Sequence, residues 1–365
     1  MHDAPRILFL DEDHVLRTLR LILCDADHDA QVRGFFAPER PDLGPLIQAA
    51  AGLRRSDGAL VGQATDPKTT FNDATLLVFR RGVIDQALFE KHPRLRLVQR
   101  LGARANDIDL AGAAARCVWV SCLPRVSLDH AAEHTFLLML ALAKRLIPAD
   151  RAVRAGIFAE GIVDVADGVA YNWSGIDGAS GLSGKTLGVI GLGEVGTLVA
   201  RIARAFGMRV VYHQRRRATP EHEREMQVTF VSQDELLAAA DFVSLHASNA
   251  PENRGLAGRE FFAGMKSSAY LVNTSRGALV DEDALYDALT RGVIAGAGLD
   301  VHAVEPRAGG DRFAALPNVV LSPHIAGGSR SGIIVELQSI VLNLQAALRG
   351  APLLHQVGAA TGASQ

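Results

Sequence analysis

The sequence predicts an α/β protein with two parallel-sheet domains, one inserted into the other. Short apolar runs typical of buried strands alternate with helical patterns along most of the chain. The length of 365 residues is sufficient for two domains. A G-x-G-x-x-G motif starts only at Gly191, after a complete sheet-building segment. Together these observations indicate a second domain nested within the first.

The segment before the glycine motif is predicted to hold four strands with helices between them. These strands are expected at residues 6–10, 76–79, 95–101 and 118–121. Residues 54–72 are rich in turn-forming residues, so we expect loops there. A long helix is predicted over residues 128–146, after Pro124.

After a loop-rich arm at residues 155–183, the alternation of strands and helices resumes. We expect strands at residues 186–190, 209–213, 230–231, 242–245, 269–273, 296–299 and 319–321. A helix over residues 331–348 closes the fold. We therefore assign residues 1–123 and 328–365 to a substrate domain and residues 124–327 to the inserted domain. Both are expected to be Rossmann-like or flavodoxin-like, with a ligand cleft between them.

The glycine motif is typical of a dinucleotide-binding turn. An apolar strand leads into Gly191, Gly193 and Gly196, and a helical pattern follows. Gly191 would allow the tight turn, Gly193 would let a pyrophosphate approach the backbone, and Gly196 would let helix and strand pack closely. The amides of Glu194 and Val195 open a helix N-terminus, which favours an anion. The motif in this context predicts that the inserted domain binds NAD(P).

Composition and charge favour a soluble, cytoplasmic protein. The formal net charge of −2 gives no reason to expect binding to nucleic acid or to an anionic membrane. Three cysteines are too few for a disulfide framework and indicate a reducing compartment. The N-terminal segment does not look like a targeting peptide, and the most apolar helix is too short to span a bilayer. No metal site is expected, because Cys117 and Cys122 have no second Cys or His pair beside them.

Three later segments place polar residues at the ends of predicted strands, where open α/β sheets bind ligands. Arg276 lies in the turn of LVNTSRGALVDEDAL, where a guanidinium can bind a carboxylate in a fork. Asp300 and Glu305 follow the strand in AGAGLDVHAVEP, and His324 follows Pro323 in LSPHIAGGS. Taken singly, the arginine is as easily a solvated surface residue, and a histidine after a strand is often structural.

Together these segments resemble the D-isomer-specific 2-hydroxyacid dehydrogenase family. The resemblance runs over nearly the whole chain and includes LGARANDID at residues 101–109 and AAEHTFLLMLALAKR at residues 131–145. It implies that Arg276, Glu305 and His324 form the active site, in the family's order. Further cofactor contacts are then expected from Thr274, Asp300 and Gly327.

The chemistry implied by this resemblance is hydride transfer between NAD(P)H and a small 2-keto or 2-hydroxy acid. His324 would supply the proton in reduction and accept it in oxidation. Because a free histidine is mostly neutral at neutral pH, the carboxylate of Glu305 would stabilise the imidazolium that donates. Arg276 would bind the substrate carboxylate and polarise the keto group. Formate dehydrogenases resemble this fold but place a glutamine beside the histidine, so Glu305 favours hydroxy-acid chemistry.

A basic run after the second strand of the inserted domain bears on the choice of cofactor. NAD sites usually carry an acid there, which binds the ribose 2′-hydroxyl. This chain has Gln214, Arg215, Arg216 and Arg217 instead. Arginines attract a 2′-phosphate that a carboxylate would repel, so the sequence favours NADP. NAD stays possible, because relatives with an arginine here still use it and the run is otherwise a solvated basic loop.

The loop at residues 102–106 departs from the family's G-x-G-x-D pattern. In relatives its backbone amides hold the substrate carboxylate, which assigns substrate contacts to Ala103 and Arg104. Arg104 replaces a glycine, and Asn106 replaces an aspartate. Arg104 either reaches a second anionic group on the substrate, or points to solvent or pairs with a nearby acid such as Asp107.

The leading interpretation is a reductase of the glyoxylate or hydroxypyruvate kind, and two rivals stay open. One is a phosphoglycerate-type dehydrogenase on the same scaffold. The other is a non-catalytic, dinucleotide-sensing corepressor, although such proteins carry extended tails. The resemblance also implies a homodimer, with Phe158, Tyr171 and Trp173 of the arm as candidate contacts. His134 and His246 are expected to have structural roles.

Overall fold

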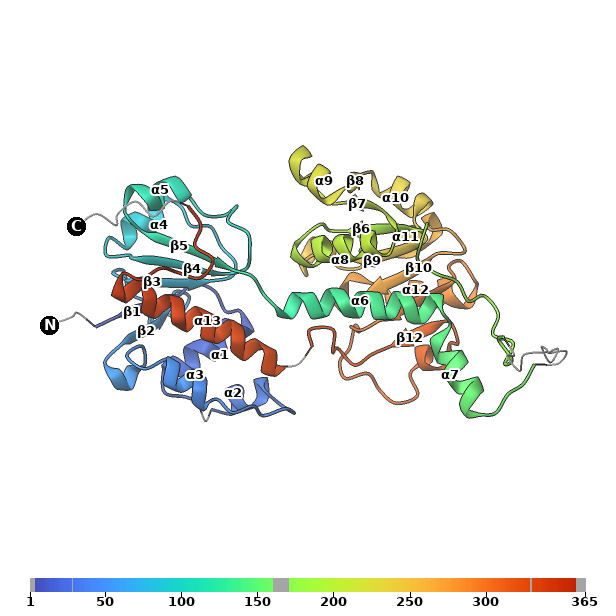
Figure 1. Cartoon of the computed structure of the whole chain (residues 1–365), viewed down its shortest axis with the longest axis horizontal. Coiled ribbons are helices and arrows are strands. Elements are labelled where there is room, and N and C mark those ends of the chain that lie inside the picture. The colour runs from blue at the N-terminus through green and yellow to red at the C-terminus, as the bar shows by residue number, and fades with distance from the viewer. Residues whose placement is uncertain (1–3, 28, 160–170, 329, 359–365) are drawn as a thin grey trace. The chain divides into compact units, whose positions relative to one another are not determined.

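The computed structural model describes residues 4–27, 29–159, 171–328 and 330–358. The chain divides into two compact units, one with residues 1–127 and 328–365 and one with residues 128–327. Each unit has its own parallel sheet (Figure 1). Among the described residues, no helix is both long and apolar enough to cross a membrane.

The first unit is built on a five-stranded parallel sheet in the order β2-β1-β3-β4-β5. Its strands are β1 (Arg6–Phe9), β2 (Leu60–Gln63), β3 (Leu76–Phe79), β4 (Leu97–Leu101) and β5 (Trp119–Leu123). Its helices are α1 (His14–Leu23), α2 (Ala30–Phe35), α3 (Gly44–Ala49), α4 (Gln86–Lys91), α5 (Leu110–Ala115) and α13 (Arg330–Arg349), with a 3₁₀ turn at η1 (Arg55–Asp57).

Successive residues of these strands enter different cores, because side chains alternate across a sheet. Ile7 and Leu97 pack with α1, α3 and α13 on one face. Leu8 and Val98 pack with α4 and α5 on the other. Figure 1 shows α13, from the C-terminal part of the chain, lying beside α1 in this unit.

The second unit has a seven-stranded parallel sheet in the order β12-β11-β10-β9-β6-β7-β8. Its strands are β6 (Thr186–Ile190), β7 (Arg209–His213), β8 (Thr229–Phe230), β9 (Phe242–Leu245), β10 (Tyr270–Asn273), β11 (Gly296–Leu299) and β12 (Val319–Leu321). Its helices are α6 (Ser127–Ala143), α7 (Leu146–Arg154), α8 (Glu194–Ala205), α9 (Pro220–Met226), α10 (Gln233–Ala239), α11 (Arg259–Gly264) and α12 (Glu282–Thr290). Short 3₁₀ turns are η2 (Pro251–Asn253), η3 (Gly277–Leu279) and η4 (Arg312–Ala315).

The order of these strands places a topological switch point at β6. The chain passes from β6 to β7 and β8 on one side, then returns to β9 on the other side of β6. Ligands of open α/β sheets bind outside the carboxyl ends of the strands at such a point. The glycine motif follows β6 directly, so it lies at that position.

The structure confirms most of the expected strands, with β3, β6, β7, β9, β11 and β12 at the expected bounds. The expectation of loops throughout residues 54–72 was wrong, because β2 lies there and pairs with β1. Its sequence signal is weak because Gly62 interrupts the apolar run. A Cβ on Gly62 would lie 2.1 Å from the Thr69 carbonyl oxygen, so the close approach of the following chain requires glycine.

The long helix expected over residues 128–146 is α6, which ends at Ala143, three residues earlier than expected. The structure has two helices, α6 and α7, with a break between Ala143 and Leu146. Arg145 adopts a left-handed backbone conformation at φ +54°, which a continuous α-helix does not allow. Lys144 and Arg145 stand at this break, but charged residues also occur within helices, so the sequence pattern alone does not place the end of α6.

Candidate active site

The turn after β6 has the geometry that a pyrophosphate needs. Gly191 has φ +96°, and a Cβ there would lie 2.9 Å from the carbonyl of His246. A Cβ on Gly196 would lie 2.2 Å from the Gly191 carbonyl oxygen, so α8 packs against the turn only with glycine at this position. Gly193, the N-cap of α8, has open space where its Cβ would be. These residues therefore fit a dinucleotide, whose phosphates the N-terminal amides of Glu194 and Val195 would face.

The basic run after β7 is divided between local contacts and solvent. The side chain of Gln214 accepts from the Leu192 amide at 3.0 Å and so braces the glycine turn. Arg215 pairs with Glu252 at 2.8 Å, and Arg217 pairs with Glu223 at 2.7 Å. The exposed guanidinium of Arg216 has no such partner among the residues that the structure describes.

Arg276 is presented by a tight turn at the end of β10. The buried side chain of Asn273 donates to the Arg276 carbonyl at 2.9 Å and accepts from the Ser275 amide at 3.1 Å. A Cβ on Gly277 would lie 2.0 Å from the His302 carbonyl oxygen, so the turn packs directly against the segment after β11. The Arg276 side chain is exposed, and its Nη1 donates to the Ser275 carbonyl at 2.6 Å.

Glu305 and His324 form the pair that the sequence predicts. The imidazole Nδ1 of His324 lies 2.7 Å from Glu305 Oε2, and the His302 amide donates to Glu305 Oε1 at 2.9 Å. Partial burial raises the pKa of Glu305, but the hydrogen bonds from His324 and the His302 amide outweigh it and hold that pKa below its usual value. The carboxylate therefore stays ionised beside the imidazole.

Asp300 is fully buried and anchors the loop that carries His324. Its backbone carbonyl accepts from the His324 amide at 2.8 Å. Its carboxylate accepts from the amides of Ile325 at 2.9 Å and Ala326 at 2.8 Å. Burial raises the pKa of Asp300, but hydrogen bonds from side chains and from these amides hold it well below its usual value. The nicotinamide contact assigned to Asp300 stays a prediction.

The neighbouring expected contacts belong to the same region. Thr274 follows β10, and its hydroxyl lies 2.8 Å from that of Thr135 on α6. Gly327 is exposed, and its Cβ position is open. His246 lies at the end of β9, where its Nε2 is 2.8 Å from Ser244 Oγ and burial lowers its pKa to about 4.

Sequence reasoning missed Ser322 and His302 in this region, and it expected only a structural role for His134. Ser322 donates to Asp300 Oδ1 at 2.7 Å. The ring Nε2 of His302 lies 2.9 Å from the Ser322 carbonyl, and His134 Nε2 lies 2.8 Å from Ser322 Oγ. His302 lies within the segment AGAGLDVHAVEP, but nothing in that segment indicates its contact with Ser322. Only the fold brings α6, which carries His134, next to the end of β12. No local signal could have linked His134 to Ser322.

Ala103 and Arg104 lie in the first unit, in the loop after β4. Gly102 begins this loop at φ +147°, and its amide donates to the Leu123 carbonyl at 2.7 Å. Ala103 is exposed and Arg104 partly exposed. Asp107, the acid considered as a partner of Arg104, lies 3.2 Å from a guanidinium nitrogen of Arg100. The structure describes the two units separately, so the joint site of Arg104 with His324 stays a prediction.

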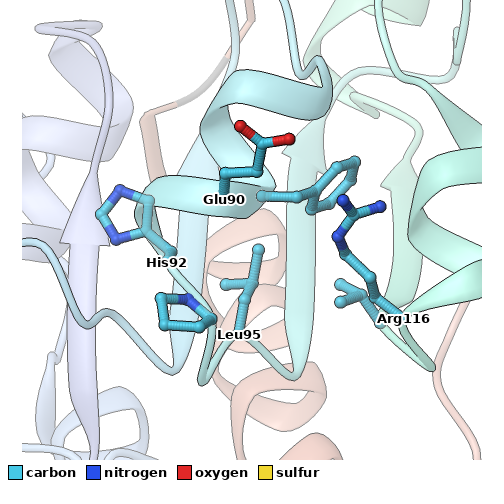
Figure 2. A pocket seen from close by; sticks show the side chains of 7 residues that line it. Glu90, His92, Leu95 and Arg116 are labelled. Atoms are coloured by element: carbon cyan, nitrogen blue, oxygen red, sulfur yellow. The ribbon is translucent and has the colours of Figure 1, made fainter.

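A cavity of about 190 Å³ in the first unit is a poor candidate for catalysis. Its residues precede β4 and β5, whereas the loop with Arg104 follows β4. Figure 2 shows Glu90 on α4 and Arg116 on the opposite wall. Glu90 accepts from Gln86 at 2.8 Å, and Arg116 donates to the Gly112 carbonyl at 3.3 Å, each within or next to its own helix. Its lining residues are Phe89, Glu90, His92, Pro93, Leu95, Arg116 and Val118.

Comparisons with known proteins define the class of this site. Residues 136–326 match the family model described as D-isomer specific 2-hydroxyacid dehydrogenase, NAD binding domain. A glyoxylate reductase of Thermococcus litoralis is 37% identical over 313 residues, which cover 86% of each chain. The chain belongs to the D-isomer specific 2-hydroxyacid dehydrogenase family. It is an NAD(P)-dependent oxidoreductase that acts on CH–OH groups.

Two solved structures are similar over almost the whole chain. A glyoxylate reductase from Paecilomyes thermophila is 27% identical, with a TM-score of 0.56 and coverage of 98% of this chain and 99% of that one. An NADPH-dependent glyoxylate/hydroxypyruvate reductase from Sinorhizobium meliloti, in complex with NADP and malonate, is 25% identical, with a TM-score of 0.53 and 97% coverage of both chains.

Proposed function

We propose that this protein is a glyoxylate or hydroxypyruvate reductase that uses NADPH. The observation that carries the proposal is the contact of 2.7 Å between His324 Nδ1 and Glu305 Oε2. An ionised carboxylate on one ring nitrogen stabilises the protonated ring, which is the form that donates a proton. The named activities of the similar proteins support the choice of substrate.

His324 and Arg276 have separate roles in the reduction. Bound NADPH supplies the hydride that reaches the keto carbon. Because Nδ1 of His324 faces Glu305, its Nε2 is the atom that gives a proton to the keto oxygen. Arg276 binds the substrate carboxylate as a fork and stabilises the negative charge that develops on the keto oxygen. Hydroxy acid and oxidised cofactor are the products, and oxidation reverses both transfers.

Arg216 supports the preference for NADPH. Its neighbours Arg215 and Arg217 are paired with acids, whereas its guanidinium has no ion pair within the described part of the chain. We expect kcat/KM to be higher with NADPH than with NADH. Losing one charge-assisted contact costs about a factor of 10, so Arg216→Ala lowers this ratio by about that factor. Arg201→Ala, an exposed arginine of α8, is the control. An NADPH-to-NADH ratio below one for the wild-type protein contradicts the preference.

Arg104 is proposed to bind a second anionic group of the substrate. Arg104→Ala is then expected to raise KM for 2-keto acids with a distal carboxylate, phosphate or sulfonate more than KM for glyoxylate. Equal KM values for the variant and the wild type across such a panel would eliminate this role.

The second unit is proposed to form a homodimer through α7 and the described parts of the arm, residues 155–159 and 171–183; the rest of the arm lies outside the described residues. Large apolar side chains are exposed there, and a monomer rarely leaves such a group in water. Phe158 is 72% exposed and packs on Trp173 with ring centroids 5.1 Å apart, while Tyr171 is 93% exposed. The exposed set on α7 and the first part of the arm is Leu146, Ile147, Val153, Ile157 and Phe158.

A substrate screen monitored by NAD(P)H absorbance tests the proposed activity. The panel contains glyoxylate, hydroxypyruvate and phosphohydroxypyruvate, each with both cofactors. We expect the highest kcat/KM with glyoxylate or hydroxypyruvate and NADPH. Preference for phosphohydroxypyruvate would indicate the phosphoglycerate type, and NADPH binding without turnover would indicate a dinucleotide sensor.

A further inference from the structure

A directed chain of hydrogen bonds runs from α6 to the loop that carries His324. His134 Nε2 lies 2.8 Å from Ser322 Oγ and 3.4 Å from Asp300 Oδ1, and Ser322 Oγ lies 2.7 Å from the same Asp300 oxygen. The Ser322 hydroxyl has one proton, and an ionised carboxylate can only accept it. The Ser322 oxygen therefore accepts the proton on His134 Nε2. Donation runs from His134 to Ser322 and on to Asp300.

Asp300 in turn binds the backbone of His324 and of the two residues that follow it. Its carbonyl holds the His324 amide at 2.8 Å, and its carboxylate holds the amides of Ile325 and Ala326 at 2.9 and 2.8 Å. One buried residue therefore binds three consecutive backbone amides. The orientation of Asp300 decides where the imidazole of His324 lies.

His324 depends on such support because of its backbone. Its φ is +57°, in the left-handed region that side chains other than glycine rarely adopt. A conformation of this kind persists only where the surrounding structure holds it. The bonds from Asp300 provide that support on the backbone, and the bond to Glu305 provides it on the ring.

α6 is suited to hold this loop in place. Thr135, the residue after His134, is fully buried and bonds both the Ala131 carbonyl and the Thr274 hydroxyl. Two adjacent residues of α6 thus reach two strand ends, those of β10 and β12. All of these residues belong to the second unit.

We propose that His134 is a positioning residue for His324, acting through Ser322 and Asp300. The effect of this positioning on catalysis rests on the proposed reductase function. His134 does not contribute a proton to the reaction. Its N–H fixes the Ser322 hydroxyl, which leaves the Asp300 carboxylate in one orientation and keeps His324 Nε2 directed for proton transfer.

Steady-state kinetics of His134→Phe test the proposal. Misplacing a reacting group by about 1 Å costs up to about 100-fold, so we expect kcat to fall by about 10- to 100-fold. KM for glyoxylate should stay within about twofold, because the substrate does not contact His134 in this account. His134→Gln, which keeps an N–H donor, should recover most of the lost kcat. His222→Phe on α9 is the matched control and should keep wild-type values.

Hydrogen exchange provides a second readout that needs no turnover. In His134→Phe the amides of Ile325 and Ala326 should exchange at least about 10-fold faster, because their acceptor is no longer held. His134→Gln and His222→Phe should protect them as the wild type does. Unchanged protection, or a kcat within about twofold of wild type, would overturn the positioning role. Absence of glyoxylate turnover in the wild type would instead refute the reductase function and leave the exchange test intact.

Discussion

At the residue scale, one nitrogen of the His324 ring has its partner within the protein. Nδ1 lies 2.7 Å from Glu305 Oε2, and the side chain is 47% exposed. Nε2 is the nitrogen that is proposed to meet the substrate. The Glu305 carboxylate is held from its other oxygen by the His302 amide. Because the pKa of Glu305 is lowered, the ionised carboxylate stabilises the folded protein at pH values above the ordinary pKa of a glutamate. This stabilisation is lost as the pH falls through the lowered pKa.

Replacement of Glu305 by Gln is predicted to reduce the activity and change its pH dependence. The imidazolium loses the carboxylate that lies 2.7 Å from its Nδ1, so the ring that donates the proton is less stabilised. We expect kcat for reduction to fall by about 100-fold at pH 7. In the wild type kcat should also fall at low pH, as Glu305 becomes protonated on passing through its lowered pKa, and this fall should be absent in the variant. A pH profile of kcat identical to that of the wild type would show that Glu305 does not act on His324.

The sequence predicts residues that carry distinctive chemistry better than residues that position them. Glu305 and His324 lie in motifs, and the structure brings them into contact. His134 lies in a motif as well, but its partner Ser322 is 188 residues away in the chain. A contact across that separation depends on how α6 packs against the sheet. Arg104 is the reverse case, because its sequence departure is plain and its role stays a prediction.

At the element scale, the turn from β6 into α8 separates glycines needed for packing from the one needed for a ligand. A Cβ on Gly196 would meet the Gly191 carbonyl oxygen at 2.2 Å, whereas a Cβ on Gly193 would meet nothing within 4 Å. The protein itself fills the space beside Gly196. The space beside Gly193, at the N-terminus of α8, is open.

Alanine should therefore reduce stability at Gly196 and cofactor binding at Gly193. Gly196→Ala is predicted to lower the free energy of unfolding by about 1–3 kcal/mol, because it overpacks the turn. Gly193→Ala should leave Tm within about 2 °C of wild type, because nothing in the fold occupies its space. It should weaken NADPH binding by at least about 10-fold, because a methyl group enters the space of the pyrophosphate. Thermal melts and fluorescence titration with NADPH measure the two effects. Equal loss of stability in both variants would contradict this division.

Elements whose cause is local were predictable, and those set by tertiary packing were not. β6, β7 and β9 are rich in apolar residues and have their expected bounds. β2 contains Gly62, which is needed because the Thr69 backbone passes close to it. A glycine within so short a run resembles a turn in the sequence. The break between α6 and α7 depends on the left-handed backbone of Arg145, which the amino-acid pattern does not reveal.

At the scale of the whole molecule, each unit has a core of its own. The cores of the first unit, on both faces of its sheet, include Leu16 and Val98. Those of the second unit include Leu271 and Val199. One group of exposed apolar residues lies on α7 and the start of the arm in the second unit, and association of two chains there would bury it.

A homodimer is the expected state in solution. Light scattering should give a mass near twice the chain mass of 38.9 kDa. A charge within an apolar interface is strongly unfavourable, so Val153→Glu, at a residue 54% exposed on α7, should yield monomers. Leu342→Glu, at a residue 50% exposed on α13, should stay dimeric. A monomeric wild type, or a dimer that survives Val153→Glu, would contradict the proposed interface.

The kcat of glyoxylate reduction by the wild type and by His324→Asn, each with saturating NADPH, tests the central claim most directly. We predict measurable wild-type turnover and a fall of about 1000-fold in the variant, because the ring that donates the proton is gone. Fluorescence titration should show NADPH binding to both proteins with Kd values within about twofold of each other. A His324→Asn variant that reduces glyoxylate at a rate close to that of the wild type would contradict the account.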